Sequence, residues 1–159
     1  MFGTLKKMQK YVSSSATRTQ KIAARMAQKI LRAKNRRKKA LIIALKGNLG
    51  AGKTTFVRGF VQGIIKRKIQ SPTFVLMKRF SIPSGVSKTF KTIFHIDAYR
   101  LKNAKAAGIL RLKELADDPS ALILIEWPER IQSALPRRRS TIYLSHTSFS
   151  KRIIKITGI

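Results

Sequence analysis

The stretch ALIIALKGNLGAGKTTF, residues 40–56, decides the fold of this 159-residue chain. Its opening run, residues 40–45, is apolar and has the length of a buried strand. A glycine-rich turn follows, and residues 54–66 then repeat apolar side chains at helical spacing. These apolar positions are Phe56, Val57, Phe60, Val61 and Ile64. A strand, a glycine loop and a helix in this order are typical of an α/β domain that binds phosphate groups.

The turn itself, GNLGAGKT at residues 47–54, matches the phosphate-loop (P-loop) pattern G-x-x-x-x-G-K-[ST]. Its glycines let the backbone turn tightly and point its N–H groups at phosphate oxygens. Lys53 would place a positive charge on the β- and γ-phosphates, and the Thr54 hydroxyl suits Mg²⁺. Because a buried strand precedes the motif and an amphipathic helix follows it, a nucleotide site is favoured over an ordinary glycine turn. The chain lacks the N-K-x-D element of GTP-specific proteins, which favours ATP.

Two of the few acidic residues stand where a phosphate-loop enzyme needs carboxylates. Glu126 directly follows the apolar run at residues 121–125, so it lies at the carboxyl end of a buried strand, where ligand sites form in α/β sheets. Asp97 ends a second apolar strand and shares one strand face with His95. Either acid is a candidate to hold Mg²⁺ while the other orients the attacking water, and the sequence leaves these two roles open. No catalytic role is predicted for His95 or His146.

The remaining segments extend the α/β pattern. We predict an amphipathic helix over residues 18–34, capped by Ser15 or Thr17, and partial helix over residues 102–116. Further strands are predicted over residues 73–82, 89–97, 121–125, 141–145 and 152–156. Turn residues between the first two of these strands predict a hairpin, so part of the sheet should be antiparallel.

The predicted fold is therefore a three-layer α/β domain of the P-loop NTPase type, with a short mixed sheet flanked by helices. We expect one domain over residues 17–159. Residues 1–16 are polar and basic, and we expect them to be disordered.

Composition limits the classes of function. The chain has 35 Lys and Arg against 6 Asp and Glu, a formal net charge of +29, and no cysteine. Disulfides and thiolate sites are excluded, and we expect no structural metal and no membrane span. The charge has two explanations, contact with RNA such as tRNA or a proteome-wide bias toward Lys and Arg. We expect a cytoplasmic protein.

Four blocks of sequence stand in order along the chain: GNLGAGKTTFVRG at 47–59, SPTF at 71–74, HIDAYRL at 95–101 and IEWPER at 125–130. Together they resemble the TsaE family of tRNA-modification proteins. The opening segment TQKIAARMA and the pair Leu135–Pro136 also fit, so the resemblance spans about residues 17–145. It implies an ATPase that works with TsaB and TsaD to form N6-threonylcarbamoyladenosine at position 37 of tRNAs that read ANN codons. The family does not itself transfer the threonylcarbamoyl group.

The resemblance implies ATP and Mg²⁺ as ligands and assigns their contacts. Thr19 would contact the nucleotide near its base, and Ser71 and Thr73 would form a switch that senses the γ-phosphate. Tyr99 and Arg100 would support this switch or face a partner. The phosphates would be held by Gly47, Asn48, Leu49, Gly50, Ala51, Gly52, Lys53, Thr54 and Thr55.

The resemblance also implies metal and catalytic roles. Thr54 and Glu126 would serve Mg²⁺ with Asp97 beside them, and Glu126, Asp97 and Lys53 would carry the catalysis. Trp127 would pack beside the site, although an indole that fills the core explains it equally well.

This chain departs from the family pattern in two ways. Asn48 stands where the family usually has an acid, within the stretch whose backbone binds phosphate, so we expect little loss of binding. The basicity also exceeds that of the family. Arg130 and residues 137–139 are candidates for an arginine finger, but the sequence does not place them at the γ-phosphate. We therefore predict slow hydrolysis by the isolated chain and faster turnover with partners. Two other functions stay open: a small-molecule kinase, and a basic RNA-binding module with a vestigial loop.

Overall fold

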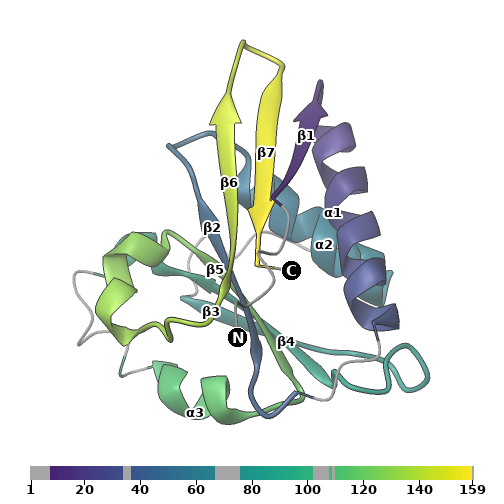
Figure 1. Ribbon diagram of the computed structural model, residues 1–159, viewed down its shortest axis with the longest axis vertical. Helices are drawn as coiled ribbons and strands as arrows, with labels where there is room; N and C mark the ends of the chain where they lie inside the picture. The colour runs from purple at the N-terminus through teal and green to yellow at the C-terminus, as the bar shows by residue number, and fades with distance from the viewer. Residues whose placement is uncertain (1–7, 34–36, 67–75, 102–107, 109, 159) are drawn as a thin grey trace, which may run out of the picture.

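The computed structural model describes residues 8–33, 37–66, 76–101, 108 and 110–158. Its centre is one seven-stranded sheet in the order β1-β7-β6-β2-β5-β4-β3 (Figure 1). The strands are β1 (Gln9–Ser13), β2 (Leu41–Lys46), β3 (Met77–Ser81), β4 (Thr92–Asp97), β5 (Ala121–Glu126), β6 (Ser140–His146) and β7 (Arg152–Thr157). The helices are α1 (Ala16–Arg32), α2 (Lys53–Ile65) and α3 (Leu112–Asp117), with 3₁₀ segments η1 (Ala98–Arg100) and η3 (Pro128–Ala134).

The middle of the sheet is parallel and its two sides are antiparallel. Strand β2 runs parallel to β5 and β6, and β5 runs parallel to β4. The β3–β4 and β6–β7 pairs are antiparallel, which confirms the mixed sheet and the hairpin that the sequence predicts. Because β2, β4 and β5 point the same way, the loop after β2 and the last residues of β4 and β5 meet at one edge. Asp97 stands opposite Glu126 there, and Glu126 stands opposite Leu45.

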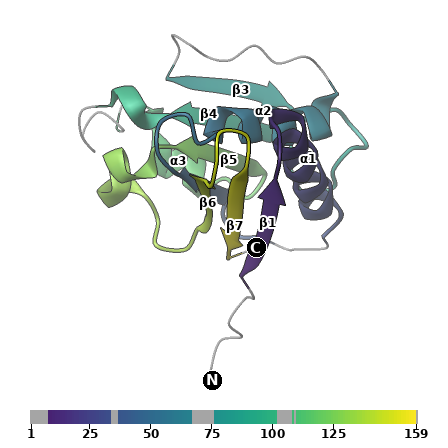
Figure 2. The same cartoon turned by 90° about the horizontal axis from the view of Figure 1, so that it is seen from above.

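Helices cover both faces of the sheet and make three layers. Strands β2 and β5 are apolar and buried on both sides, as central parallel strands are. Ile43 and Leu124 pack in the cluster that α1 and α2 cover, whereas Ile42 and Ile123 pack in the cluster on the opposite face with α3 and η3. Figure 2 shows α1 and α2 together on one side of the molecule and α3 away from them.

The contact between α1 and α2 depends on a glycine. A Cβ atom added to Gly59 would lie only 2.4 Å from the Cα atom of Gln20, so the two backbones touch at this point. The apolar stripe of α1 faces this contact and is buried or nearly so, as its periodicity predicts. Ser15 caps α1, and its side chain accepts a hydrogen bond from the backbone N–H of Arg18 at 3.0 Å.

The sequence prediction is wrong at the N-terminus for residues 9–13. They form β1, an edge strand that pairs antiparallel with β7, so this part of the chain is not disordered. Tyr11 pairs with Ile154 and Val12 pairs with Ile153, while Ser13 is fully buried. The strand was not predicted because it is stabilised by pairing with β7 at the other end of the chain. The basic composition of residues 1–16 gives no sign of that pairing.

The other predicted elements are found with shifted ends. The helix expected over residues 102–116 is described as the short α3, and the strand expected over residues 73–82 as β3. Residues 102–107, 109 and 73–75 lie outside the described part of the chain. None of the helices described here has the length and apolar character needed to cross a membrane.

Candidate nucleotide site

The loop between β2 and α2 has the backbone shape that its glycines predict. Gly50 has φ 75° and Gly52 has φ 99°, values that side-chain-bearing residues rarely adopt. A Cβ atom added to Gly47 would lie 2.3 Å from the carbonyl oxygen of Leu144 on β6. The loop is therefore fixed against the neighbouring strand, and its end leads directly into α2, where backbone N–H groups are available to an anion.

Lys53 opens α2 and folds back over the loop. Its Nζ donates hydrogen bonds to the carbonyl oxygens of Gly47 at 2.6 Å and Asn48 at 3.0 Å. The same ammonium lies 3.6 Å from the centre of the Trp127 ring, a cation–π contact. Burial lowers the pKa of Lys53, and the nearby carboxylates of Glu126, Glu129 and Asp97 partly oppose that effect. A buried cation at the mouth of this loop is suited to attract phosphate oxygens.

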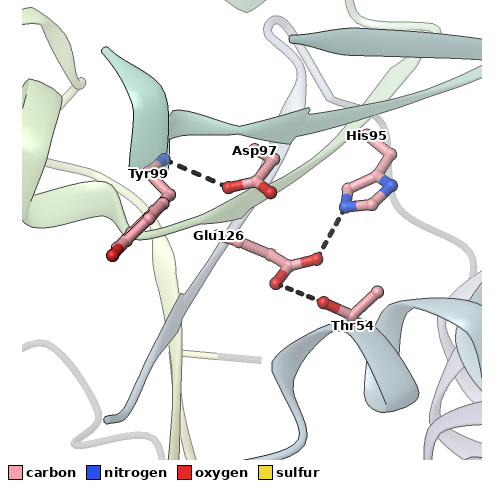
Figure 3. A network of polar contacts seen from close by, with 5 residues as sticks. All are labelled: Thr54, His95, Asp97, Tyr99 and Glu126. Carbon is pink, nitrogen blue, oxygen red and sulfur yellow. Dashed lines mark hydrogen bonds and ion pairs between the residues drawn. The ribbon is translucent and has the colours of Figure 1, made fainter. Parts of the chain in front are cut away.

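The Glu126 side chain at the end of β5 contacts both the start of α2 and strand β4, as Figure 3 shows. The Thr54 hydroxyl donates to Glu126 Oε2 at 2.9 Å, and His95 Nε2 lies 2.8 Å from Glu126 Oε1. Glu126 and His95 are each 2% exposed. A buried carboxylate with a partner at each oxygen is held in one orientation. The strands β4 and β5 and the start of α2 thus supply one side chain each to a single network.

Asp97 stands beside this network at the end of β4 (Figure 3). Its Oδ1 atom accepts a hydrogen bond from the backbone N–H of Tyr99 at 3.1 Å, which caps η1. The carboxylate lines the same pocket as Glu126. The two acids that the sequence singles out therefore lie in one pocket. Asp97 is bonded to a backbone N–H, whereas Glu126 is bonded to two side chains.

Aromatic side chains close the side of the pocket opposite the loop. Trp127 has a left-handed backbone, φ 56° and ψ 50°, directly after β5. Its ring lies 5.0 Å from that of Tyr99, and the Arg130 guanidinium lies 5.7 Å from the Tyr99 ring. Two cations, Lys53 and Arg130, thus flank a pair of aromatic rings. Trp127 lines the pocket with Tyr99 and also packs against the core cluster on the α3 face, so both positions that the sequence left open for it are occupied by one side chain.

The pocket suits a nucleotide with a divalent cation. It has a volume of about 280 Å³ and is lined by the loop on one side and by Asp97, Tyr99, Glu126 and Trp127 on the other. The Thr54 hydroxyl and the Glu126 and Asp97 carboxylates are hard oxygen donors of the kind that Mg²⁺ prefers. Within the described residues, no group of three or more His, Cys, Asp or Glu could form a metal cage.

The comparisons with known proteins place this chain in a family. Residues 13–154 match the family model described as "Threonylcarbamoyl adenosine biosynthesis protein TsaE". The chain belongs to the TsaE family. It is 33% identical over 116 residues to tRNA threonylcarbamoyladenosine biosynthesis protein TsaE of Haemophilus influenzae, covering 72% of this chain and 69% of that protein. It is 34% identical over 119 residues to TsaE of Bacillus subtilis, covering 74% of this chain and 70% of that protein.

A solved structure supports the same assignment. The chain is similar to the crystal structure of Bacillus subtilis YdiB, with a TM-score of 0.70 and 26% identity. The likeness covers 99% of this chain and 89% of that one. The family and fold expected from the sequence are confirmed, and as a TsaE protein the chain has a role in tRNA threonylcarbamoyladenosine biosynthesis.

Several residues that the TsaE resemblance singles out lie apart from the pocket or outside the described chain. Thr19 is fully buried, and its hydroxyl lies 2.8 Å from that of Ser13 and donates to the Ser15 carbonyl at 3.2 Å. Its contact with a nucleotide stays a prediction. Ser71 and Thr73 lie outside the described residues, so the predicted switch also stays a prediction.

Sequence reasoning missed two histidines that contact this TsaE site. His95 bonds Glu126, and His146 Nε2 lies 2.8 Å from the carbonyl oxygen of Gly50 in the phosphate loop. The signal for His95 was present, because its spacing from Asp97 places both side chains on the face of β4 that carries the site. His146 offered no local signal, since it reaches the loop only through the pairing of β6 with β2.

Proposed function

We propose that this chain binds MgATP at its phosphate loop and hydrolyses ATP in support of a TsaB–TsaD complex. That complex would form N6-threonylcarbamoyladenosine at position 37 of tRNAs that read ANN codons, and this chain would not transfer the threonylcarbamoyl group itself. The observation that carries the ATPase proposal is the network in which Thr54 and His95 hold the buried Glu126 carboxylate. Membership of the TsaE family supports the choice of pathway.

Lys53 and the loop amides bind the phosphates in this proposal. The Lys53 ammonium turns from the carbonyls of Gly47 and Asn48, which it now contacts, to the β- and γ-phosphate oxygens. Phosphoryl transfer needs positioning and charge stabilisation more than covalent help, so a fixed loop and one cation contribute directly to catalysis.

Thr54, Glu126 and Asp97 would hold Mg²⁺, which supplies neutralisation of the charge on the transferred phosphoryl group. The Thr54 hydroxyl presents its oxygen at the loop, and His95 keeps the Glu126 carboxylate turned toward it. Asp97 lines the pocket from the adjacent strand end and is the candidate to orient the attacking water. Variants of Glu126 and Asp97 will distinguish which acid binds Mg²⁺ and which orients the attacking water.

Arg130 is the arginine-finger candidate that contacts the pocket, since its guanidinium packs on Tyr99. Arg130 is exposed and does not line the pocket, so it would have to move to reach a γ-phosphate. A partner that positions it, or supplies an arginine of its own, would accelerate slow hydrolysis by the isolated chain.

The test is ATP hydrolysis by the purified chain, alone and with TsaB and TsaD from the same source. Glu126→Gln keeps the shape of the side chain and removes its charge, and we expect it to abolish partner-stimulated turnover. Glu114→Gln is the matched control, because Glu114 is an exposed acid paired with Arg111 outside the pocket. If partners leave the rate unchanged while the chain still hydrolyses ATP, the ATPase proposal survives and the partner proposal fails.

A further inference from the structure

The solvent face of α1 carries a row of positive charges. Its members recur three or four residues apart, so they stack along one side of the helix. This basic stripe of α1 consists of Arg18, Lys21, Arg25, Lys29 and Arg32, and every one of them is exposed. From its first to its last residue the stripe is about 21 Å long. Helix α1 lies at the outside of the molecule in both views, which agrees with the exposure of these five residues (Figures 1 and 2).

No acidic residue balances the stripe. The first acid in the sequence is Asp97, far beyond α1. The salt bridges formed among the described residues join Lys39 to Asp117, His95 to Glu126 and Arg111 to Glu114, so none includes a residue of the stripe. Like charges three or four residues apart destabilise a helix. The stripe is therefore a continuous positive surface that is open to a polyanion.

The other face of α1 determines which anion fits. Its apolar side chains, among them Ile22, Met26 and Ile30, are buried in the core against α2 and the sheet. An amphipathic helix that inserts into a lipid surface buries its apolar face among the headgroups, and α1 has no apolar face left to insert. Only charge is available on the outer face, and charge alone is what recognises the phosphate backbone of a nucleic acid.

We propose that the basic stripe of α1 binds the phosphate backbone of a folded RNA. The choice of tRNA as that RNA rests on the proposed function, whereas the location of the site rests on the stripe. Among the described residues, none of those that line the nucleotide pocket belongs to α1. The stripe is therefore a surface separate from that pocket.

The test compares two variants that lose equal charge. In the stripe variant, Arg18, Lys21, Arg25, Lys29 and Arg32 become Gln, which keeps good helix propensity. In the control variant, five exposed cations elsewhere become Gln. These are Lys38, Lys88, Lys91, Lys113 and Lys155. The affinity of each full chain for an unmodified tRNA transcript is measured between 50 and 200 mM salt.

We expect the stripe variant to bind the transcript at least about 30-fold more weakly at 100 mM salt and to lose about three units of the salt slope, since each neutralised phosphate contributes close to one unit. The control variant should lose less than about fivefold. Neither variant should melt at a lower temperature, since the replaced side chains are exposed and the loss of like charges on α1 relieves repulsion. Both should keep their binding of a fluorescent ATP analogue, because none of the replaced residues lines the pocket. These two readouts separate loss of the RNA surface from misfolding and from failure of the ATPase proposal.

Three results would overturn the proposal. If both variants lose the same affinity for the transcript, binding depends on net charge and the stripe is not a specific RNA site. If the unaltered chain does not bind the transcript at 100 mM salt, RNA is excluded as the partner of the stripe. Binding to vesicles with anionic headgroups in preference to the transcript, lost in the stripe variant, would assign the stripe to a membrane surface.

Discussion

The Thr54 hydroxyl and the Glu126 carboxylate meet across 72 positions of sequence, with 2.9 Å between Oγ1 and Oε2. One stands in the first turn of α2 and the other at the last position of β5. The parallel pairing of β2 with β5 makes the contact possible, because it puts the start of the phosphate loop beside the end of β5. This contact links the phosphate loop directly to the acidic end of β5, so both belong to one site.

Removing the Thr54 hydroxyl should weaken the use of Mg²⁺. In Thr54→Val the side chain keeps its shape but offers no oxygen, and Glu126 Oε2 loses its donor. We expect Mg²⁺-dependent turnover to fall by about 10-fold to 100-fold, the usual effect of disturbing a metal site and its supports. Thr54→Ser retains the hydroxyl and should stay within a few-fold of the unaltered chain. Equal rates for Thr54→Val and the unaltered chain across a Mg²⁺ titration would contradict the metal role.

His95 should act as a positioning residue for Glu126. His95→Ala leaves the buried Glu126 with one partner fewer, which should lower the free energy of unfolding by about 1–3 kcal/mol. Turnover should fall by about 10-fold to 100-fold because the carboxylate is no longer held toward Thr54. His95→Gln carries a donor of similar reach and should recover part of the activity. If both variants lose stability but turn over ATP normally, His95 has only a structural part.

Local patterns in the sequence predicted most of the sheet and the position of Glu126 at a strand end. The runs at 40–45 and 121–125 are apolar throughout, so their burial as central strands followed directly, and Glu126 followed from its place after the second run. The apolar spacing of α1 and α2 likewise set which helix faces are buried. Each of these features depends on a local pattern of about a dozen neighbouring residues.

What escaped prediction depends on residues far apart in the chain. Strand β1 exists because it pairs with β7, and His146 reaches Gly50 because β6 lies beside β2. The position of Trp127 over Lys53 requires a left-handed backbone at Trp127, which no local pattern signalled. Pairings of this kind are decided by tertiary structure, which propensity and periodicity do not contain.

Adding a methyl group at Gly59 should destabilise the chain. The new Cβ atom would lie 2.4 Å from Gln20 Cα and 2.5 Å from the Gln20 carbonyl oxygen, and neither backbone atom can yield without moving α1. We expect Gly59→Ala to lower the free energy of unfolding by about 1–3 kcal/mol, the range for overpacking, despite the better helix propensity of Ala. Gly108→Ala is the control, because a Cβ atom there meets nothing within 4 Å. Denaturant melts of both variants make the comparison, and an unchanged or raised midpoint for Gly59→Ala would contradict the close contact.

Trp127 should report nucleotide binding through its own fluorescence. It is the chain's single tryptophan, and the Lys53 ammonium lies 3.6 Å from its ring centre. Binding of ATP should draw that ammonium from the indole to the phosphates and change the emission. Lys53→Met removes the charge and keeps an extended side chain, so its emission should stay constant as ATP is added. A fluorescent ATP analogue measures binding independently of the indole. If the unaltered chain binds the analogue but its tryptophan emission does not change when ATP is added, the predicted movement of the Lys53 ammonium away from Trp127 is contradicted.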